Sequence, residues 1–268
     1  MSFFQKSGLL NKQVLLIDGV SLEIRYYPGQ ATKPTLIFLH EGLGCVELWR
    51  DFPKRVSELS GCPALVYSRQ GYGRSQACEV PRPLSYMHTE GLDVLPELLK
   101  VAGIKGHIVI GHSDGGSIAL IHAGGSPSAG LSAVITMAPH VFCEDLSVSA
   151  IEKTKQVFLD GDLREKLKKY HHDNIDCAFW GWNKAWLDPG FIYWTIEEYL
   201  PKIDVPQLVI QGKQDPYGTV AQVVSIAKHC AGDVHIHMID QCAHSPFIEK
   251  TLECLDTIVY FLENDCGV

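Results

Sequence analysis

Short apolar runs recur along the chain, and segments of helical length separate them. In most runs the apolar residues occupy consecutive positions, which is typical of parallel strands buried on both faces of a sheet. Six runs predict strands: Thr35–Leu39, Ala64–Tyr67, His107–Ile110, Ala133–Ala138, Gln207–Ile210 and Val234–Ile239. The expected helices are Val46–Leu59, Thr89–Val101, Ser113–Ala123, Val220–His229 and Pro246–Glu263. This alternation predicts an α/β sheet with helices on both faces.

An antiparallel start precedes the alternation. The segments Gln13–Asp18 and Val20–Tyr27 flank Asp18-Gly19, a dipeptide typical of a two-residue β-hairpin. The sheet is therefore expected to be mixed, with its parallel part following the hairpin.

The expected helix Thr89–Val101 carries a stripe of leucines and its own boundary signals. Thr89 is a candidate N-cap, and Gly103 is a candidate stop. Pro96 lies inside the stripe and predicts a kink, because proline has no N–H to donate and its ring crowds the preceding turn.

One segment breaks the alternation. Residues 144–203 have a helical pattern without a clear strand, and they hold four of the five tryptophans: Trp180, Trp182, Trp186 and Trp194. An insertion of this size between two strands is expected to form a helical cap over the carboxyl edge of the sheet. We therefore divide the chain into a first core part (1–143), a cap (144–203) and a second core part (204–268).

Composition excludes several classes of function. Hydrophobic residues make up 46% and charged residues 20% of the 268 positions, as in ordinary globular domains. The net charge of −8 argues against a nucleic-acid partner, because phosphate binding needs a basic face. The nine cysteines include no C-x-x-C pair, so we expect neither a zinc site nor a disulfide framework. We expect no metal and no organic cofactor.

The sequence also bears on location. The segment Met1–Leu10 has one lysine and no long apolar run, so it is not expected to be a secretory signal. No stretch approaches the roughly 18 apolar residues that a membrane span needs. We expect a cytoplasmic protein with no membrane partner, and a homodimer is left open.

The segment His107–Gly116 carries the strongest chemical signal, because a buried strand there runs through a tight turn into an apolar helix. Positions 111–115 read Gly-His-Ser-Asp-Gly, which in this setting is typical of a nucleophile elbow. Ser113 must adopt a strained backbone to expose its hydroxyl, and Gly111 and Gly115 keep side chains out of so sharp a turn. Ser113 is therefore the expected nucleophile.

A serine hydroxyl needs a base, and the base needs an orienting carboxylate. After a nucleophile elbow the order is serine, acid, histidine. His244 follows the last expected strand and Asp215 follows the strand before it, so both are expected at the same sheet edge as Ser113.

Other histidines and acids fit less well. His229 falls late in an expected helix, while His235 and His237 lie inside an expected strand. Glu144 or Asp145, which follow the preceding strand, are the alternative acids.

Attack by Ser113 places negative charge on an oxygen, which backbone N–H groups must stabilise. One donor is expected from Asp114, the residue after the nucleophile. The other is expected from the loop after Thr35–Leu39, where Gly42 is the first choice and Leu43 its rival. His40 in that loop is interpreted as a structural residue rather than as the base.

Five elements of the chain resemble the α/β-hydrolase superfamily in the expected order, over roughly Leu15 to Leu262. They are His40-Glu-Gly-Leu-Gly44, Ser68-Arg-Gln-Gly-Tyr-Gly-Arg-Ser75, Gly111-His-Ser-Asp-Gly-Gly116, Gly212-Lys-Gln-Asp215 and Ala243-His244. The resemblance implies the α/β-hydrolase fold: a mostly parallel eight-stranded sheet flanked by helices, with a helical cap at Glu144–Ile203.

Within the superfamily, the Gly-x-Ser-Asp-Gly-Gly elbow looks closest to small-molecule hydrolases. These include biphenyl-hydrolase-like amino-acid ester hydrolases, enol-lactonases and carbon–carbon bond hydrolases of aromatic breakdown. Haloalkane dehalogenases and epoxide hydrolases are similar in fold only, since their chemistry needs a carboxylate where this chain has Ser113.

One residue departs from the family pattern. Many relatives have His-Gly at the oxyanion loop, whereas this chain has His40-Glu41. A carboxylate there would oppose the developing negative charge unless it points away. Glu41 can alternatively recognise a cationic or hydroxyl group of the substrate.

Candidate substrate contacts come from the loops after the strands and from the cap. They are Glu41, Leu43, Phe142, Trp180, Trp186 and Tyr217. Asp114 has two interpretations: it favours the start of a helix, or it selects a cationic group on the substrate.

We therefore expect a serine hydrolase that cleaves a small-molecule ester, thioester or lactone through an acyl-enzyme. A carbon–carbon bond hydrolase and a cofactor-free acyltransferase or perhydrolase would use the same residues. A ligand-binding receptor on a hydrolase fold is the alternative from another class.

Overall fold

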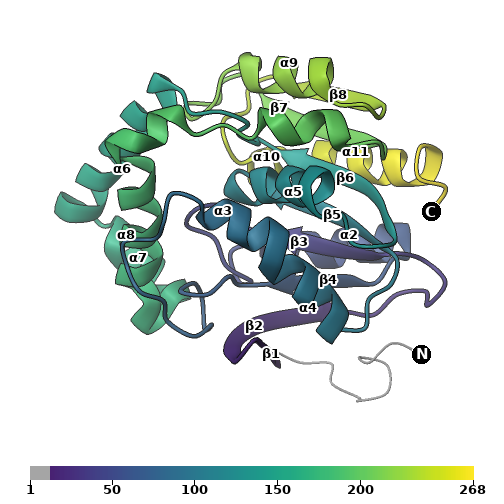
Figure 1. Cartoon of the computed structure of the whole chain (residues 1–268), viewed down its shortest axis with the longest axis horizontal. Coiled ribbons are helices and arrows are strands. Elements are labelled where there is room, and N and C mark those ends of the chain that lie inside the picture. Colours follow the sequence, from purple (N-terminus) through teal and green to yellow (C-terminus); the bar gives the residue numbers. More distant parts are fainter. Residues whose placement is uncertain (1–12) are drawn as a thin grey trace.

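The computed structural model describes residues 13–268. The prediction made for Met1–Leu10 lies outside the described residues. Within them, eight strands form one sheet in the order β1-β2-β4-β3-β5-β6-β7-β8 (Figure 1). The strands are β1 (Gln13–Ile17), β2 (Val20–Tyr27), β3 (Thr35–Leu39), β4 (Ala64–Tyr67), β5 (His107–His112), β6 (Leu131–Met137), β7 (Gln207–Gly212) and β8 (Val234–Ile239).

The hairpin prediction is confirmed. Strands β1 and β2 pair antiparallel around Asp18 and Gly19, whose φ angles of 47° and 82° match the left-handed backbone that a two-residue hairpin turn needs. Strand β2 also pairs antiparallel with β4, and every pair from β4 to β8 is parallel. The expected fold class, a mostly parallel eight-stranded sheet flanked by helices, is therefore confirmed.

Successive side chains of a strand point to opposite faces of a sheet, so each buried strand contributes side chains to two separate cores. In β3, Ile37 and Leu39 face the core under α4 (Leu95–Val101), α5 (Asp114–Gly125) and α9 (Val220–His229). Leu36 and Phe38 face the other core, under α2 (Phe52–Ser60) and α11 (Thr251–Asn264). Consecutive apolar residues are thus required in β3, as the sequence pattern predicts.

Three expected helices differ from the structure at their ends. The first of them begins at Phe52 rather than Val46, with Pro53 in its first turn, where proline is well tolerated. The C-terminal one divides at Lys250 into α10 (Pro246–Glu249) and α11. The helix expected from Thr89 begins a turn earlier as α3 (Tyr86–Thr89), so Thr89 is not its N-cap.

The helix does not end at Pro96; its hydrogen-bonding pattern changes from α to π just before that residue. Residues Glu90–Val94 form a π-helical turn, η1, between α3 and α4. Proline removes a hydrogen-bond donor and crowds the preceding turn, and a π-bulge widens that turn. Gly103 then ends the helix with a φ of 68°, as expected.

Residues 144–203 are helical, and the helices between residues 145 and 186 lie at one side of the sheet (Figure 1). They form α6 (Asp145–Asp160), α7 (Leu163–His171), η2 (His172–Asn174), α8 (Ile175–Trp186), η3 (Pro189–Tyr193) and η4 (Glu197–Lys202). One isolated bridge, Phe142 to Thr195, joins the two ends of this segment, which we call the helical segment. Among residues 13–268, no helix has the length and apolar character to cross a membrane.

Candidate active site

The turn between β5 and α5 holds Ser113 in a strained backbone conformation. Its φ of 52° and ψ of −119° lie outside the regions that ordinary residues adopt. A Cβ on Gly111 would stand 2.2 Å from the carbonyl oxygen of Gly115, and a Cβ on Gly115 would stand 2.0 Å from that of Leu39. Both glycines are therefore required by close backbone contacts on either side of Ser113.

Loops from neighbouring strands bring a histidine and an aspartate to this serine. His244, in the loop after β8, places its Nε2 2.9 Å from Ser113 Oγ. Its Nδ1 lies 2.9 Å from each carboxylate oxygen of Asp215, in the loop after β7. Nδ1–H therefore points to the carboxylate, and the Nε2 lone pair points to the serine hydroxyl. This arrangement allows His244 to take a proton from Ser113.

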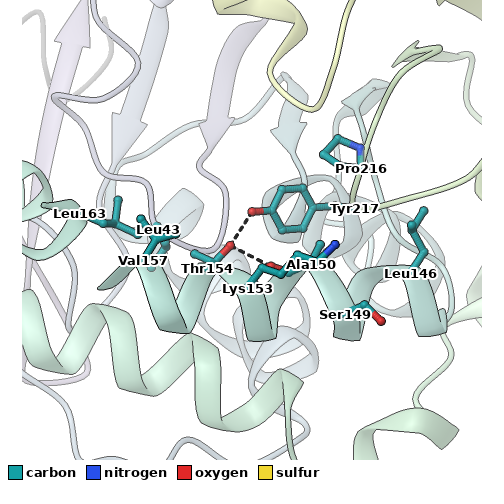
Figure 2. A pocket seen from close by; sticks show the side chains of 10 residues that line it. All are labelled: Leu43, Leu146, Ser149, Ala150, Lys153, Thr154, Val157, Leu163, Pro216 and Tyr217. Carbon is teal, nitrogen blue, oxygen red and sulfur yellow. Dashed lines mark hydrogen bonds between the residues drawn. The ribbon is translucent and has the colours of Figure 1, made fainter. Parts of the chain in front are cut away.

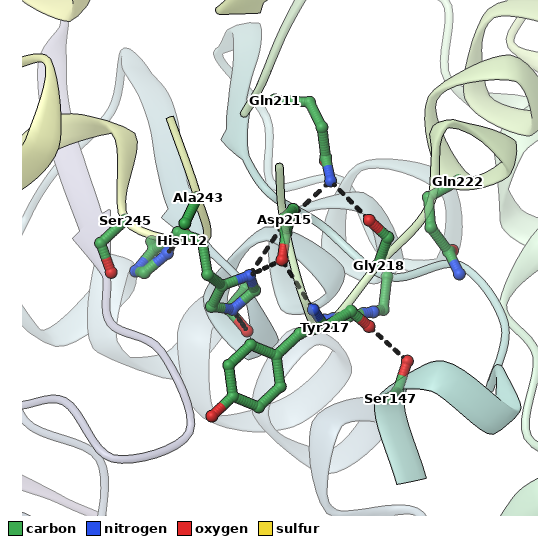
Figure 3. Close-up of polar contacts among 12 residues, drawn as sticks. His112, Ser147, Gln211, Asp215, Tyr217, Gly218, Gln222, Ala243 and Ser245 are labelled. Carbon is green, nitrogen blue, oxygen red and sulfur yellow. Dashed lines mark hydrogen bonds and ion pairs between the residues drawn. The ribbon is translucent and has the colours of Figure 1, made fainter. Parts of the chain in front are cut away.

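Asp215 is held by donors other than His244 (Figure 3). The backbone N–H of Tyr217 donates to Oδ1 at 2.8 Å, and Gln211 Nε2 donates to Oδ2 at 2.9 Å. Burial favours the neutral acid, but the hydrogen bonds and charge of His244 outweigh it, so the pKa of Asp215 lies below its ordinary value. Asp215 therefore stays ionised and keeps the imidazole of His244 oriented. Glu144, the alternative acid, instead binds Thr219 and Gln222.

The loop after β3 lies beside Ser113 and is fixed by His40. The Nε2 of His40 accepts the backbone N–H of Arg69 at 3.0 Å, so its Nδ1 donates to the carbonyl oxygen of Glu41 at 2.7 Å. Burial and the nearby Arg69 charge hold the pKa of His40 well below its ordinary value. His40 is thus a neutral residue that shapes the loop.

Gly42 in that loop lies directly under the helical segment. A Cβ at position 42 would stand 2.2 Å from the indole nitrogen of Trp182, so only glycine fits there. Gly42, Leu43 and Asp114 all line one cavity together with Ser113.

Glu41 turns back over its own loop rather than toward the serine. Its Oε2 lies 3.5 Å from Nδ1 of His112, and a Cβ on Gly44 would stand 2.3 Å from the same oxygen. The Nε2 of His112 lies 2.7 Å from the carbonyl oxygen of His244, so Nε2 carries a proton. Burial raises the pKa of Glu41, but the hydrogen bond and charge of His112 outweigh it and the net shift is downward.

Asp114 is buried in a network of donors. Tyr86 donates to Oδ2 at 2.5 Å, Trp186 Nε1 donates to Oδ1 at 3.2 Å, and Arg69 Nη2 lies 3.7 Å from Oδ2. Burial raises the pKa of Asp114, whereas the positive charge of Arg69 and these hydrogen bonds lower it. Burial has the larger effect, so the pKa lies above its ordinary value. Because protein groups occupy both carboxylate oxygens, the structure favours the structural interpretation of Asp114 over recognition of a substrate cation.

A cavity of about 200 Å³ lies between the core loops and the helical segment. Of the expected substrate contacts, Glu41, Leu43, Trp186 and Tyr217 line it. Residues that sequence reasoning did not assign to it also contribute: His140, Ser147, Ile151, Trp182 and Ser245. Burial and the His244 charge lower the pKa of His140 to about 3, so His140 presents a neutral ring.

Two of the expected contacts are corrected, since Phe142 and Trp180 do not line this cavity. Phe142 lies in the bridge to Thr195, and its carbonyl oxygen accepts a hydrogen bond from Gln222. Trp180 packs edge-on against Phe179 inside the helical segment. Helix periodicity explains the second correction: Trp182 and Trp186 are four residues apart on one face of α8, and Trp180 falls on another.

A larger cavity of about 530 Å³ lies next to the first but contains neither Ser113 nor His244 (Figure 2). Its wall is mostly α6, with Ala150, Thr154 and Val157 among the lining residues. Leu43 and Tyr217 line both cavities, so they stand at the boundary between them. Ser113 and His244 line only the smaller of the two cavities.

Within the described part of the chain, no group of three or more histidine, cysteine, aspartate or glutamate side chains is arranged to hold a metal ion.

Comparison with known proteins bears on the family and the fold of the chain. Residues 36–257 match the model of the alpha/beta hydrolase family. No curated protein sequence matches the chain.

Solved structures are similar in fold at low sequence identity. An enol-lactonase from Burkholderia xenovorans is 18% identical with a TM-score of 0.70, covering 94% of this chain and 100% of that chain. An esterase from Exiguobacterium antarcticum is 16% identical with a TM-score of 0.75, covering 95% and 100%. A serine hydrolase involved in carbazole degradation is 16% identical with a TM-score of 0.72, covering 94% and 98%.

Proposed function

The chain belongs to the alpha/beta hydrolase family and is a hydrolytic enzyme, and on that premise we propose that it is a serine hydrolase that cleaves a small-molecule ester, thioester or lactone. The observation that carries the proposal is the hydrogen-bonded series Ser113–His244–Asp215, with 2.9 Å at each step. A nucleophile, a base and an orienting acid at these distances are what acyl transfer requires.

In the proposed reaction, Ser113 Oγ attacks the carbonyl carbon of the substrate while His244 Nε2 takes the hydroxyl proton. The tetrahedral oxyanion collapses, and His244 returns the proton to the leaving oxygen or sulfur. Water then attacks the acyl-enzyme and gives a proton to His244; the bond to Ser113 Oγ breaks, His244 returns the proton to Oγ, and the carboxylic acid departs. Asp215 stays ionised and stabilises the imidazolium.

The oxyanion is proposed to lie between the backbone N–H groups of Asp114 and Gly42, with Leu43 as the alternative second donor. Asp114 begins α5, and its N–H is free of helical partners at that end of the helix. The carboxylate of Glu41 does not oppose this charge, because it faces His112 rather than Ser113.

The helical segment, residues 144–203, is proposed to act as a cap between two core parts, 1–143 and 204–268. Four of its side chains, Ser147, Ile151, Trp182 and Trp186, line the cavity that holds Ser113. They exclude water from the reacting carbonyl and define the space that an acyl group can occupy.

The cavity supports a small, largely uncharged substrate. Its volume of about 200 Å³ suits a short acyl or aryl group. The Asp114 carboxylate already has its partners, so a cationic group on the substrate is not required. The enol-lactonase and the esterase among the structural neighbours favour lactone and ester chemistry.

Covalent labelling and turnover test the proposal. A fluorophosphonate should label Ser113 in the native protein and leave Ser113→Ala unlabelled. The native protein should hydrolyse p-nitrophenyl acetate and butyrate faster than the laurate ester, because the cavity limits chain length. Labelling without turnover on any ester or lactone would favour a ligand-binding receptor instead.

A carbon–carbon bond hydrolase is the second candidate. Trp182, Trp186 and Tyr217 give the cavity an aromatic wall, and one structural neighbour acts in the degradation of an aromatic compound, carbazole. Turnover of a β-diketone-like ring-cleavage product at a higher kcat/KM than any ester would favour this candidate.

A further inference from the structure

Two cysteines far apart in the sequence meet at the junction between the core and the helical segment. Cys78 lies in the loop after β4, and Cys177 lies in the first turn of α8, 99 residues later. Their sulfur atoms are 2.8 Å apart, about 0.8 Å beyond the length of a disulfide bond. Both side chains are partly exposed, so a small oxidant can reach them.

The backbone and a buried arginine converge on the same pair. The N–H of Cys78 lies 3.3 Å from Cys177 Sγ, and Cys177 Sγ lies 3.1 Å from the carbonyl oxygen of Cys78. A Cβ on Gly71 would stand 2.6 Å from each sulfur and 2.7 Å from Arg82 Nη2. One small space therefore holds both thiols and a guanidinium group.

Arg82 is fixed in that space. Its Nη2 donates to the carbonyl oxygen of Gln70, and its guanidinium carbon lies 4.8 Å from the centre of the Tyr72 ring. No acidic side chain is in ion-pair contact with Arg82 among the described residues. The positive charge of Arg82 lies near both sulfurs and favours a thiolate there, and it also acts on the buried Glu90.

The contacts of the two sulfurs differ, because the backbone N–H of Cys78 lies 3.3 Å from Cys177 Sγ. The hydrogen bond from the Cys78 thiol, together with the Cys78 N–H and the Arg82 charge, holds the pKa of Cys177 below its ordinary value despite burial. By contrast, burial raises the pKa of the half-buried thiols of Cys143 and Cys230.

We propose that Cys78 and Cys177 form a redox-active dithiol site that hydroperoxides oxidise to an intramolecular disulfide. The Cys177 thiolate attacks the peroxide O–O bond, which gives a sulfenic acid on Cys177 and releases the leaving oxygen as water or an alcohol. The Cys78 thiol then attacks the Cys177 sulfur, the S–S bond forms, and the sulfenic oxygen leaves as water. In total, two thiols and one hydroperoxide give one disulfide, one water and one alcohol or second water.

The bond would join the loop after β4 covalently to the helix that carries Trp182 and Trp186. Oxidation therefore fixes one wall of the cavity to the core, and a thiol reductant releases it. The proposed disulfide stands independently of the proposed hydrolase function, because none of the groups it is argued from belongs to the series Ser113–His244–Asp215.

Mass spectrometry of the full-length protein after treatment with hydrogen peroxide tests the proposal. The expected product has lost the mass of two hydrogens, contains a Cys78–Cys177 cross-linked peptide, and is restored by dithiothreitol. Its midpoint of thermal unfolding should rise by roughly 5 °C, because the cross-link closes a long loop in the unfolded chain.

Three single variants supply the controls. Cys78→Ser should stop the oxidation at a sulfenic acid on Cys177, which dimedone traps, and Cys177→Ser should leave Cys78 as a free thiol. Cys230→Ser removes a half-buried thiol elsewhere and should form the cross-link as the native protein does. A cross-link between other cysteines, or sulfinic acid on Cys177 in the native protein with no cross-link, would overturn the proposal even if all variants hydrolyse esters normally.

Discussion

Different interactions dominate the two walls of the cavity that contains Ser113. The core wall consists of loops after the carboxyl ends of neighbouring parallel strands, and hydrogen bonds fix its polar groups, as at Asp215 and His244. The helical wall is mostly apolar, with Ile151, Trp182 and Trp186 facing the cavity. Hydrogen bonds also join that wall to the core: Trp186 Nε1 donates to Asp114, Ser147 Oγ donates to the carbonyl oxygen of Tyr217, and Thr154 Oγ1 lies 2.8 Å from the Tyr217 hydroxyl.

Under the proposed function, chemistry and selectivity reside in separate parts of the chain. Changes in the core wall should lower the rate for every substrate, since they alter the reacting groups themselves. Changes in the helical wall should alter which substrates bind, since they change volume and shape. Contacts that join the walls should chiefly affect stability.

The largest effect is expected at the centre of the core wall. Asp215→Asn keeps the shape of the side chain but can stabilise neither the tautomer nor the charge of His244, so kcat should fall by about 10⁴ for all esters. Steady-state kinetics on p-nitrophenyl acetate and butyrate measures this. Asp240→Asn, in the exposed Lys213–Asp240 pair, is the matched control and should retain activity.

An equal loss of kcat in Asp215→Asn and Asp240→Asn would contradict the assignment of Asp215 as the acid. A loss confined to one ester would contradict the separation of the two walls.

The next effect is expected where Asp114 joins the walls. Asp114→Asn leaves the buried Arg69 without its partner carboxylate and weakens the bonds from Tyr86 and Trp186. The free energy of unfolding should fall by about 3 kcal/mol, measured by urea denaturation. Activity on neutral esters should fall much less than in Asp215→Asn, and if stability stays unchanged, the proposed bridge is wrong.

The stability differences caused by Asp114→Asn and by Asp215→Asn should depend on pH with opposite signs. The pKa of Asp114 is raised, so native protein should gain stability over Asp114→Asn as the pH falls from the raised pKa toward the ordinary value of about 3.9. The pKa of Asp215 is lowered, so the stability difference from Asp215→Asn should stay constant over that range and shrink only below it. Urea denaturation from pH 7 to 4 separates the two, and parallel curves would contradict the contrast.

Much of the core wall could be predicted from the sequence, because strand patterns and the residues of tight turns determine where its side chains lie. Parallel strands bring their carboxyl ends to one edge, so Ser113, Asp215 and His244 were expected to meet before any distance was known. The collisions at Gly111 and Gly115 follow from the same tight turn. Strand limits agree within a few residues because burial on both faces requires consecutive apolar residues.

The helical wall could not be predicted in the same detail. The tryptophan-rich segment indicates helices, but which side chains face the cavity depends on how α6 and α8 rotate against the core. Trp180 was therefore expected at the cavity, whereas Trp182 lies there. The contacts of Asp114 with Tyr86 and Trp186 join residues 28 and 72 positions apart, and no local pattern signals them.

A smaller effect, on selectivity, is expected from a larger side chain in the helical wall. Ile151 is 2% exposed and lines the catalytic cavity, so Ile151→Phe should reduce the space for an acyl chain. The butyrate-to-acetate ratio of kcat/KM should fall roughly tenfold, because loss of the space for one methylene group changes discrimination by at least about that factor. Val157→Phe, on the same helix but in the larger cavity, is the matched control and should leave the ratio unchanged.

The smallest effect is expected at the polar contact between the walls. Tyr217 follows Asp215 in the core, and its hydroxyl lies 2.8 Å from Thr154 Oγ1 on α6 (Figure 2). Tyr217→Phe and Thr154→Val should each lower the free energy of unfolding by about 1 kcal/mol, since one partly exposed hydrogen bond is lost. The double variant should cost little more than either single one, because both remove the same interaction. Additive losses in urea denaturation would mean that the two hydroxyls act independently, and this contact would then not join the walls.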